Sequence, residues 1–445
     1  MAEPADAGLP ASPLQALIDK GRITPIQIRA ILLCTLVTLC EGIDLNLIPL
    51  LAPAMQKAWH LDAAAFGAIF ASGPIGLIAG GFGIGWLADR IGRRGALISA
   101  MVVMTLATLL MAFARNLPEL FACRVLTGIG FGGVVPAAAA LVSEFLPTKT
   151  RGSVVAFVIL GQVFGGLFVS LGMQTSLATL GWQTLVFWMS VLCGVTTLVM
   201  VAALPESPRY LLLRYPGTKK LADTLARLRL TELPAPEADP HAAGQASVSA
   251  LFTRDRALGT VLLWLVFIGV CAMVSFFTSW LPLIFVSAGK TAIEGAQASS
   301  AYWSGGIVSG LLLPLFALRW HVNRVLMCAI FAAGVCCVTL GFTVAGAMPL
   351  NLVMALGAGM FVNGSFYLLY PPAVRFYPTG IRSTGIGAAV AFGRIGNVLS
   401  PWVAGRLLAA GFAPIAVFQG MALPLLLSLA ALWAFHRLTS KQTEL

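Results

Sequence analysis

Long apolar runs separated by short polar segments dominate the chain and predict its secondary structure. A helix needs about 20 mostly apolar residues to cross a bilayer. The runs predict twelve such helices, near residues 27–52, 63–86, 95–114, 119–143, 152–175, 182–204, 257–285, 297–318, 325–345, 349–371, 384–408 and 413–435. The pattern therefore predicts an all-α integral membrane protein with two sets of six helices.

The polar segments divide the chain into five parts. We expect a cytoplasmic N-terminal segment (1–26), a first bundle (27–204), a cytoplasmic linker (205–256), a second bundle (257–435) and a cytoplasmic tail (436–445). Leu221 to Leu230 predict one helix in the Pro-rich linker. Residues 14–22 predict either a short amphipathic helix on the membrane surface or a solvated tail. No basic start followed by an apolar core indicates a cleaved signal peptide.

Composition agrees with the membrane prediction. Of 445 residues, 58% are hydrophobic and only 10% are charged, against roughly 25% charged in a typical soluble domain. The formal net charge of +11 could suggest a nucleic-acid partner. However, the basic residues gather in the loops predicted to be cytoplasmic, which is the usual signature of membrane orientation. We therefore expect a lipid bilayer and no nucleic acid as partner, with both chain termini in the cytoplasm.

An internal repeat relates the two halves. EFLPTKTRGS (144–153) reappears as RFYPTGIRST (375–384), and Gly165 falls on Gly396 at the same offset. Each copy lies at the predicted cytoplasmic turn between the fourth and fifth helix of its half. The halves therefore resemble duplicated bundles, the architecture of alternating-access transporters that hold their substrate between two repeats.

Two acids, Glu41 and Asp44, lie well inside the first span. A charge at the bilayer centre costs about 2.5 to 3.5 kcal/mol even on the lenient insertion scale, so their presence needs a reason. Three residues apart, they share one helical face, where neighbouring carboxyls can load and release a proton. The alternative is that both acids only pair with intramembrane arginines.

Apart from Arg29 in the first turn of the span 27–52, three arginines fall inside predicted helices: Arg124, Arg394 and Arg406. Arg124 lies at a depth that lets it pair with the acids of the first span. Arg394 lies near the midplane of a half without an acid inside its spans, so its partner is expected to be helix 1 or a substrate carboxylate, which suits the planar guanidinium. The alternative for Arg394 is a water-filled cavity. Arg406 is expected to reach the membrane interface.

Aromatic and amide side chains of the second half could complete a binding site. Trp280 and Tyr367 are candidates for stacking on an aromatic ligand, although each could equally belong to the core. Asn363 needs a partner within an apolar span, either a neighbouring helix or a substrate hydroxyl. All eight cysteines lie in apolar spans without a zinc-like His array, so neither metal nor disulfide is expected. No nucleotide loop or catalytic motif indicates an enzyme or a cofactor.

Several motifs resemble those of a known transporter family. GWLADRIGRRG (85–95), RVLTGIGFGGVVP (124–136) and PESPRYL (205–211) resemble signatures of the major facilitator superfamily. EGID (41–44), TSWLP (278–282), NGSFY (363–367) and FGRIGN (392–397) are similar to those of its aromatic acid:proton symporters. Two positions depart from the pattern: Glu41 stands where the family usually has Asp, and ALRWHVNR (317–324) lacks the acid that corresponds to Asp89.

The resemblance implies a cytoplasmic gate. It assigns this role to Asp89, Arg90, Arg93 and Arg94 in the loop between helices 2 and 3, with Glu144 and Arg151 at the turn between helices 4 and 5. Asp89 is expected near the N-terminus of helix 11, where the helix dipole favours a negative charge. Simple anchoring of the arginines at the membrane surface is the alternative, and it leaves Asp89 unexplained.

These observations together predict a proton-coupled symporter that imports a small aromatic carboxylate by alternating access, as a monomer in the plasma membrane, which for a bacterium is the inner membrane. The substrate anion would lie between the halves on Arg394 and Arg124, with the proton on Asp44 or Glu41. Alternatives are a porter of another organic anion or of a sugar-like solute, a drug:proton antiporter and a membrane receptor. The antiporter is disfavoured because GQVFGG (161–166) lacks the proline of that pattern.

Overall fold

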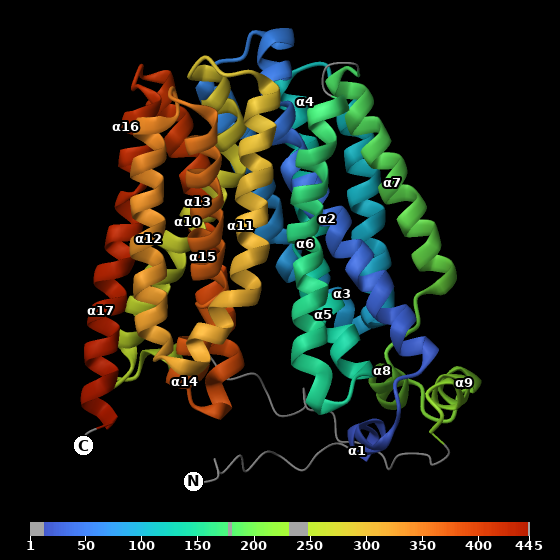
Figure 1. Cartoon of the computed structure of the whole chain (residues 1–445). Coiled ribbons are helices and arrows are strands. Elements are labelled where there is room, and N and C mark those ends of the chain that lie inside the picture. Colours follow the sequence, from blue (N-terminus) through green and yellow to red (C-terminus); the bar gives the residue numbers. More distant parts are fainter. Residues whose placement is uncertain (1–12, 177–179, 231–247, 444–445) are drawn as a thin grey trace.

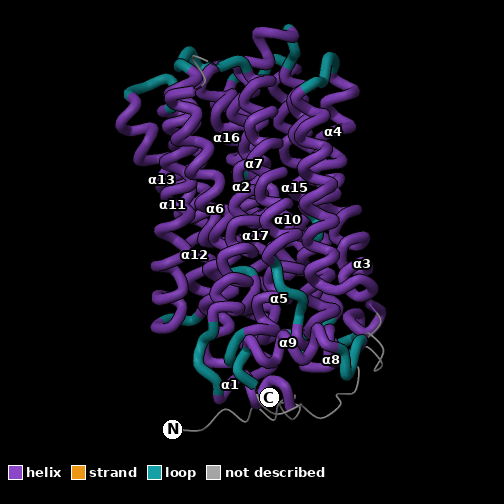
Figure 2. Tube along the Cα trace, turned by 90° about the vertical axis from the view of Figure 1, so that its right-hand side faces the viewer, coloured by secondary structure: helices purple, strands orange, loops and turns teal. Residues whose placement is uncertain are grey.

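The computed structural model describes residues 13–176, 180–230 and 248–443, and every regular element in these ranges is a helix (Figure 1). The helices run side by side from one end of the molecule to the other. Figure 2, turned by 90°, shows the same direction of the helices and places α1, α8 and α9 beyond one end of the bundle. We call this the α1 end and the opposite one the outer end.

The first half contains six membrane crossings. They are α2 (Pro25–Trp59), the two parts of α3 (Ala63–Ala112), α4 (Leu117–Phe131) continued by α5 (Val134–Phe145), α6 (Thr148–Ser176) and α7 (Trp182–Ala203). The second half is built from α10 (Ala257–Ser287), α11 (Ala292–Arg319), α12 (Val322–Thr343), α13 (Met348–Tyr367) with α14 (Tyr370–Phe376), α15 (Arg382–Ala409), and α16 (Pro414–Met421) with α17 (Leu423–Thr443).

Length and composition bear out the predicted spans. Within the described ranges, ten helical segments are long and apolar enough to cross a membrane, with α3 counted once. The second part of α3 and the arginine-bearing α15 complete the twelve crossings. The prediction of two six-helix bundles is therefore confirmed.

The segment between the second and third spans corrects one expectation. We predicted a loop there, but the helix continues through it and is broken only at Gly92, whose φ of 88° and ψ of 165° are not helical. Glycine adopts such a positive φ without steric cost, so a single residue suffices to bend the chain. The predicted gate residues Asp89, Arg90, Arg93 and Arg94 consequently lie on helix ends rather than in a loop.

The repeat in the sequence corresponds to a repeat in packing. A Cβ atom on Gly165 of α6 would overlap the backbone of α2 at Leu39, and one on Gly396 of α15 would overlap the backbone of α10 at Ile268. Glycine allows this close approach of helices. The fifth helix of each half thus contacts the first helix of the same half in an equivalent way.

Short helices cover the α1 end of the first half. They are α1 (Pro13–Lys20), α8 (Pro208–Arg214) and α9 (Lys219–Arg227), while the turns η2 (Val248–Phe252) and η3 (Thr379–Ile381) belong to the second half. The linker helix α9 starts and ends slightly before the predicted 221–230. Leu14 and Ile18 of α1 are buried against α8 and α9. The described part of the predicted amphipathic stretch is therefore helical over Pro13–Lys20, and its apolar face packs on protein rather than on the membrane surface.

Candidate functional site

Asp44 and Arg124 form a buried ion pair within the first half. Arg124 Nη1 lies 3.3 Å from Asp44 Oδ2, and the side chains of Asp44 and Arg124 are 0% and 3% exposed. Thr108 of α3 donates to Asp44 Oδ1 at 2.9 Å. The pair is thus held by three helices, α2, α3 and α4. Because a buried charge is stable only when it is paired and hydrogen-bonded, each partner depends on the other.

Glu41 lies one turn away and has a different environment. It is buried, and its Oε1 accepts a long hydrogen bond of 3.5 Å from Gln162 of α6. Its Oε2 has no hydrogen-bond partner among the described residues. The charged group that interacts with it most strongly belongs to the other half of the protein, the guanidinium of Arg394. Glu41 therefore faces the interface between the halves, whereas Asp44 is satisfied within its own half.

Arg394 crosses the interface between the halves. It lies on α15 and donates from Nη1 to the backbone carbonyl of Leu77 on α3, at 2.8 Å. Gly81, one turn further along α3, leaves room for the guanidinium, because a Cβ atom there would overlap Nη1. The side chain is only partly buried, so it keeps donors free for a ligand in addition to the contact with Leu77.

Tyr370 is a site candidate that sequence reasoning missed. It begins α14, is 37% exposed and interacts electrostatically with Arg394. Its ring packs edge-on against Phe267, with centroids 6.0 Å apart. The only signal for Tyr370 in the sequence is the position of an aromatic residue at the α1 end of a span. Such a position is also typical of aromatic residues at the membrane interface.

The predicted aromatic and amide candidates separate into two places. Asn363 of α13 donates to the carbonyl of Gly359 at 3.0 Å and lies against Gly306 of α11. The hydroxyls of Tyr367 and Tyr302 are buried and have no hydrogen-bond partner in the described part of the chain. These groups lie in the second half between α11 and α13. Unsatisfied buried hydroxyls require an explanation such as a ligand or water.

Trp280 belongs to the contact between the halves near the outer end. It is fully buried, donates from Nε1 to the Pro401 carbonyl at 3.1 Å and packs edge-on against Phe70 of α3 at 5.2 Å. It also borders a cavity of about 380 Å³ beside Gln56 and Phe412. In this conformation Trp280 helps to close the outer end. Its hydrogen bond and its ring contact involve Pro401 and Phe70, not Arg394.

Two further polar contacts join the halves on the side of the outer end. Trp303 of α11 donates to Asn46 Oδ1 of α2 at 3.1 Å, and Gln174 of α6 donates to Ser300 of α11 at 3.0 Å. At the α1 end, by contrast, the two bundles diverge (Figure 1). The conformation is therefore closed at the outer end.

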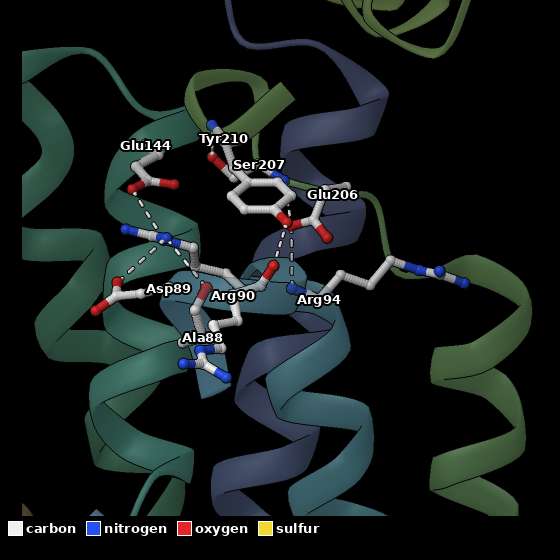
Figure 3. Close-up of polar contacts among 9 residues, drawn as sticks. Ala88, Asp89, Arg90, Arg94, Glu144, Glu206, Ser207 and Tyr210 are labelled. Carbon is white, nitrogen blue, oxygen red and sulfur yellow. Dashed lines mark hydrogen bonds and ion pairs between the residues drawn. The ribbon is translucent and has the colours of Figure 1, made fainter. Parts of the chain in front are cut away.

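The predicted gate residues form two groups at the α1 end (Figure 3). In the first group, Arg93 lies 3.4 Å from Glu144 and 3.7 Å from Asp89, whose side chain is 55% exposed. These contacts stay within the first half. The expected contact of Asp89 with α15 is not formed between described residues in this conformation, as the separation of the bundles requires. The guanidinium of Arg151 joins neither group, and its Nε lacks a hydrogen-bond partner within the described ranges.

The second group surrounds Glu206, which we did not predict as a site residue. Its Oε1 accepts from the backbone N–H groups of Arg94, at 3.1 Å, and Ser207, at 2.9 Å. Tyr210 donates to the Arg90 carbonyl at 2.9 Å (Figure 3). Burial raises the pKa of the Glu206 carboxyl, although these N–H groups and nearby arginines act in the opposite direction. Glu206 is part of the PESPRYL motif. The spacing of that motif did not show that Glu206 contacts the bend at Gly92.

Two duplicated six-helix bundles with ionisable residues at their interface define the class of alternating-access membrane transporters. The chain belongs to the Major Facilitator Superfamily, whose sequence model matches residues 34–401, and within it to the aromatic acid:proton symporter family. This membership confirms the resemblance seen in the motifs and the prediction of a transporter rather than an enzyme.

Individual relatives agree over most of the chain. It is 32% identical to the 4-hydroxybenzoate transporter PcaK of Pseudomonas aeruginosa, with 94% of both chains covered. It is 33% identical to the 3-(3-hydroxy-phenyl)propionate transporter of Escherichia coli K12, with 88% of this chain and 89% of the relative covered. A solved structure of the xylose transporter XylE from E. coli shares the fold, with a TM-score of 0.72, 16% identity and coverage of 92% and 96%.

Proposed function

We propose that this protein imports a small aromatic carboxylate together with protons, by alternating access, across a bacterial inner membrane with both chain termini in the cytoplasm. The observation that carries the proposal is the position of Arg394, a partly exposed arginine that reaches across the interface toward Glu41. Two bacterial relatives are named as transporters of hydroxylated aromatic acids, and these names support the proposed substrate class.

The substrate carboxylate binds Arg394. A guanidinium offers five donors in a fixed fork, and the hydrogen bond to the Leu77 carbonyl uses one donor group of Arg394. The ring of the substrate lies toward Tyr370, whose phenol interacts with the same guanidinium. Tyr367, Asn363 and Trp280 remain candidates for contacts made when the halves move. Arg124 is an indirect contributor, because its charge is already paired with Asp44.

Proton and substrate are coupled because two anions compete for one guanidinium. When Glu41 is ionised, it is the counter-ion of Arg394; when Glu41 is protonated, the charge of Arg394 becomes available to the substrate carboxylate. Proton and anion then enter the site together, which is the requirement of symport. Asp44 keeps Arg124 paired and holds α2 in place, so that Glu41 stays at the interface.

The test is ligand binding to purified protein by calorimetry or competition. Arg394→Lys should weaken benzoate binding by about 2 to 5 kcal/mol, or roughly 30-fold to several thousand-fold, because an ammonium lacks the two-pronged donor geometry. Arg406→Lys is the matched control on the same helix, since Arg406 lies 5.9 Å from the Trp402 ring near the outer end. Equal binding of benzamide and benzoate to the unaltered protein would contradict carboxylate recognition and favour a neutral solute.

A further inference from the structure

A groove on the outside of the first half lies between α2 and α7 at the α1 end. Its volume is about 480 Å³, and apolar side chains line it, except for Arg29. Ile28 and Leu32 on its wall are 49% and 61% exposed, so this face of the bundle is directed at the membrane. The groove is separate from the interface between the halves, where Arg394 lies.

The depth of the groove matches the boundary between lipid headgroups and hydrocarbon. With 35 residues at about 1.5 Å each, α2 exceeds the roughly 30 Å thickness of the hydrocarbon core, so its first turns project into the headgroup region. Arg29 lies about 6 Å from the start of the helix at Pro25. Leu33 and Leu32 lie one turn deeper, at the level where acyl chains begin.

Arg29 has no anionic partner in the described part of the protein. Its Nε is buried without a hydrogen-bond partner among the described residues, and it takes no part in the ion pairs Arg93–Asp89, Arg93–Glu144 and Arg124–Asp44. A second guanidinium, that of Arg94, is fixed at the same end of α7 by the carbonyls of Val201 and Leu204. The apolar groove thus ends at Arg29, a guanidinium without an anionic partner among the described residues, whereas Arg94 lies near the Glu206 carboxylate.

We propose that this groove binds an anionic phospholipid, with its phosphate on Arg29 and one acyl chain along Leu32, Leu33 and Val199. The occupant must be amphipathic, because one end of the groove is cationic and the remainder faces hydrocarbon. A zwitterionic lipid carries its own cation beside the phosphate and gains less from Arg29. A basic residue near a membrane surface favours anionic lipid by about fivefold in affinity. The inference is independent of the transported solute.

Native mass spectrometry of the purified protein tests this site. Titration with phosphatidylglycerol and with phosphatidylcholine of the same acyl chains should show about fivefold tighter binding of the first phosphatidylglycerol. Arg29→Gln should abolish that preference. Arg324→Gln is the matched control: it removes an exposed arginine from the first turn of α12 in the other half and should leave the preference intact.

A second variant separates the groove from the charge. Ala203→Phe places a ring in the groove but keeps Arg29, so it should weaken the first binding step of both lipids. Melting temperatures of each variant in detergent confirm that the fold is retained. An Arg29→Gln protein that still prefers phosphatidylglycerol would overturn the assignment, and so would an equal loss of preference in Arg324→Gln, which would indicate a general effect of surface charge.

Discussion

At the scale of single residues, the protein distinguishes its two membrane-buried acids by their partners. Asp44 has Arg124 and Thr108, whereas Glu41 has a long hydrogen bond to Gln162 and an electrostatic partner in the other half. Breaking a buried pair leaves an uncompensated charge, which is strongly destabilising. The two acids should therefore respond differently to substitution.

Removal of the Asp44 charge should destabilise the fold. Asp44→Asn leaves Arg124 buried and unpaired, so we expect a loss of about 3 to 5 kcal/mol in unfolding free energy. The double variant Asp44→Asn, Arg124→Gln should recover most of this loss. Thermal unfolding in detergent measures both, with Asp62→Asn as control, because Asn caps the start of α3 as well as Asp does. Additive losses in the double variant would show that the two charges are not coupled.

Removal of the Glu41 charge should uncouple transport from protons. Glu41→Gln mimics the protonated acid permanently, so Arg394 stays available to the substrate at every pH. We expect counterflow of substrate in proteoliposomes to continue, while accumulation driven by an imposed pH gradient is lost. Wild-type accumulation by Glu41→Gln would remove this residue as the proton carrier and return the role to Asp44.

At the scale of elements, the bend in α3 depends on one glycine and on the segment that contacts it. Gly92 has φ of 88°, and a Cβ atom there would overlap the Glu206 carboxyl and approach the Tyr210 ring. The bend carries the Arg93 side chain to Glu144. It also brings the backbone N–H of Arg94 to the Glu206 carboxylate (Figure 3). The segment from the end of α7 into α8 and the bend within α3 therefore form one structural unit at the α1 end.

Substitution of Gly92 should cost more than substitution elsewhere in α3. Gly92→Ala forces a residue with a Cβ atom into a positive-φ, extended conformation that is essentially restricted to glycine, at roughly 1 to 3 kcal/mol, in addition to the overlap with Glu206. Gly85→Ala is the matched control, because it has open space and gains helix propensity. Chemical or thermal unfolding should rank Gly85→Ala at or above wild type and Gly92→Ala below it. Equal stabilities would contradict the strained bend.

The pH dependence of stability should reveal Glu206. Because burial raises its pKa in the folded protein above the usual 4.5, its favourable contribution is present below pH 4.5 and is lost as pH rises through the folded pKa. Glu206→Gln stays neutral, so its stability relative to wild type should increase as pH rises from 4.5 toward neutrality. If the stability difference between wild type and Glu206→Gln does not change with pH, the Glu206 carboxyl has the same pKa in the folded and unfolded states, which contradicts this prediction.

At the scale of the whole molecule, the halves are joined at the outer end by Trp303 with Asn46, Gln174 with Ser300, and Trp280 with Phe70. Alternating access requires these contacts to break while contacts form at the α1 end, where the Asp89 side chain is 55% exposed beside Arg93. The balance between the two conformations should therefore respond to single hydrogen bonds at the outer end.

Loss of one outer contact should shift the protein toward the outward-open conformation. Trp303→Phe removes the hydrogen bond to Asn46, worth about 0.5 to 1.5 kcal/mol, or roughly a 2- to 12-fold change in the conformational equilibrium. Labelling of Ser300→Cys by a membrane-impermeant maleimide should accelerate by that factor. Trp433→Phe, at a 52% exposed position on α17, is the control. Unchanged labelling would mean that the Trp303 contact does not hold the outer end closed.

The sequence by itself determined the helices, their duplication, the buried acids and arginines and the family, because hydropathy and motif spacing are local properties of the chain. It also identified Arg124 as a partner within reach of the first helix. Only the tertiary structure decided that Asp44 rather than Glu41 pairs with Arg124, and that Arg394 donates to the Leu77 carbonyl. It also decided that Trp280 helps to close the outer end and that Glu206 contacts the bend at Gly92. Such pairings depend on which faces of distant helices meet, and close backbone approaches at glycines such as Gly165 and Gly396 fix those faces in three dimensions.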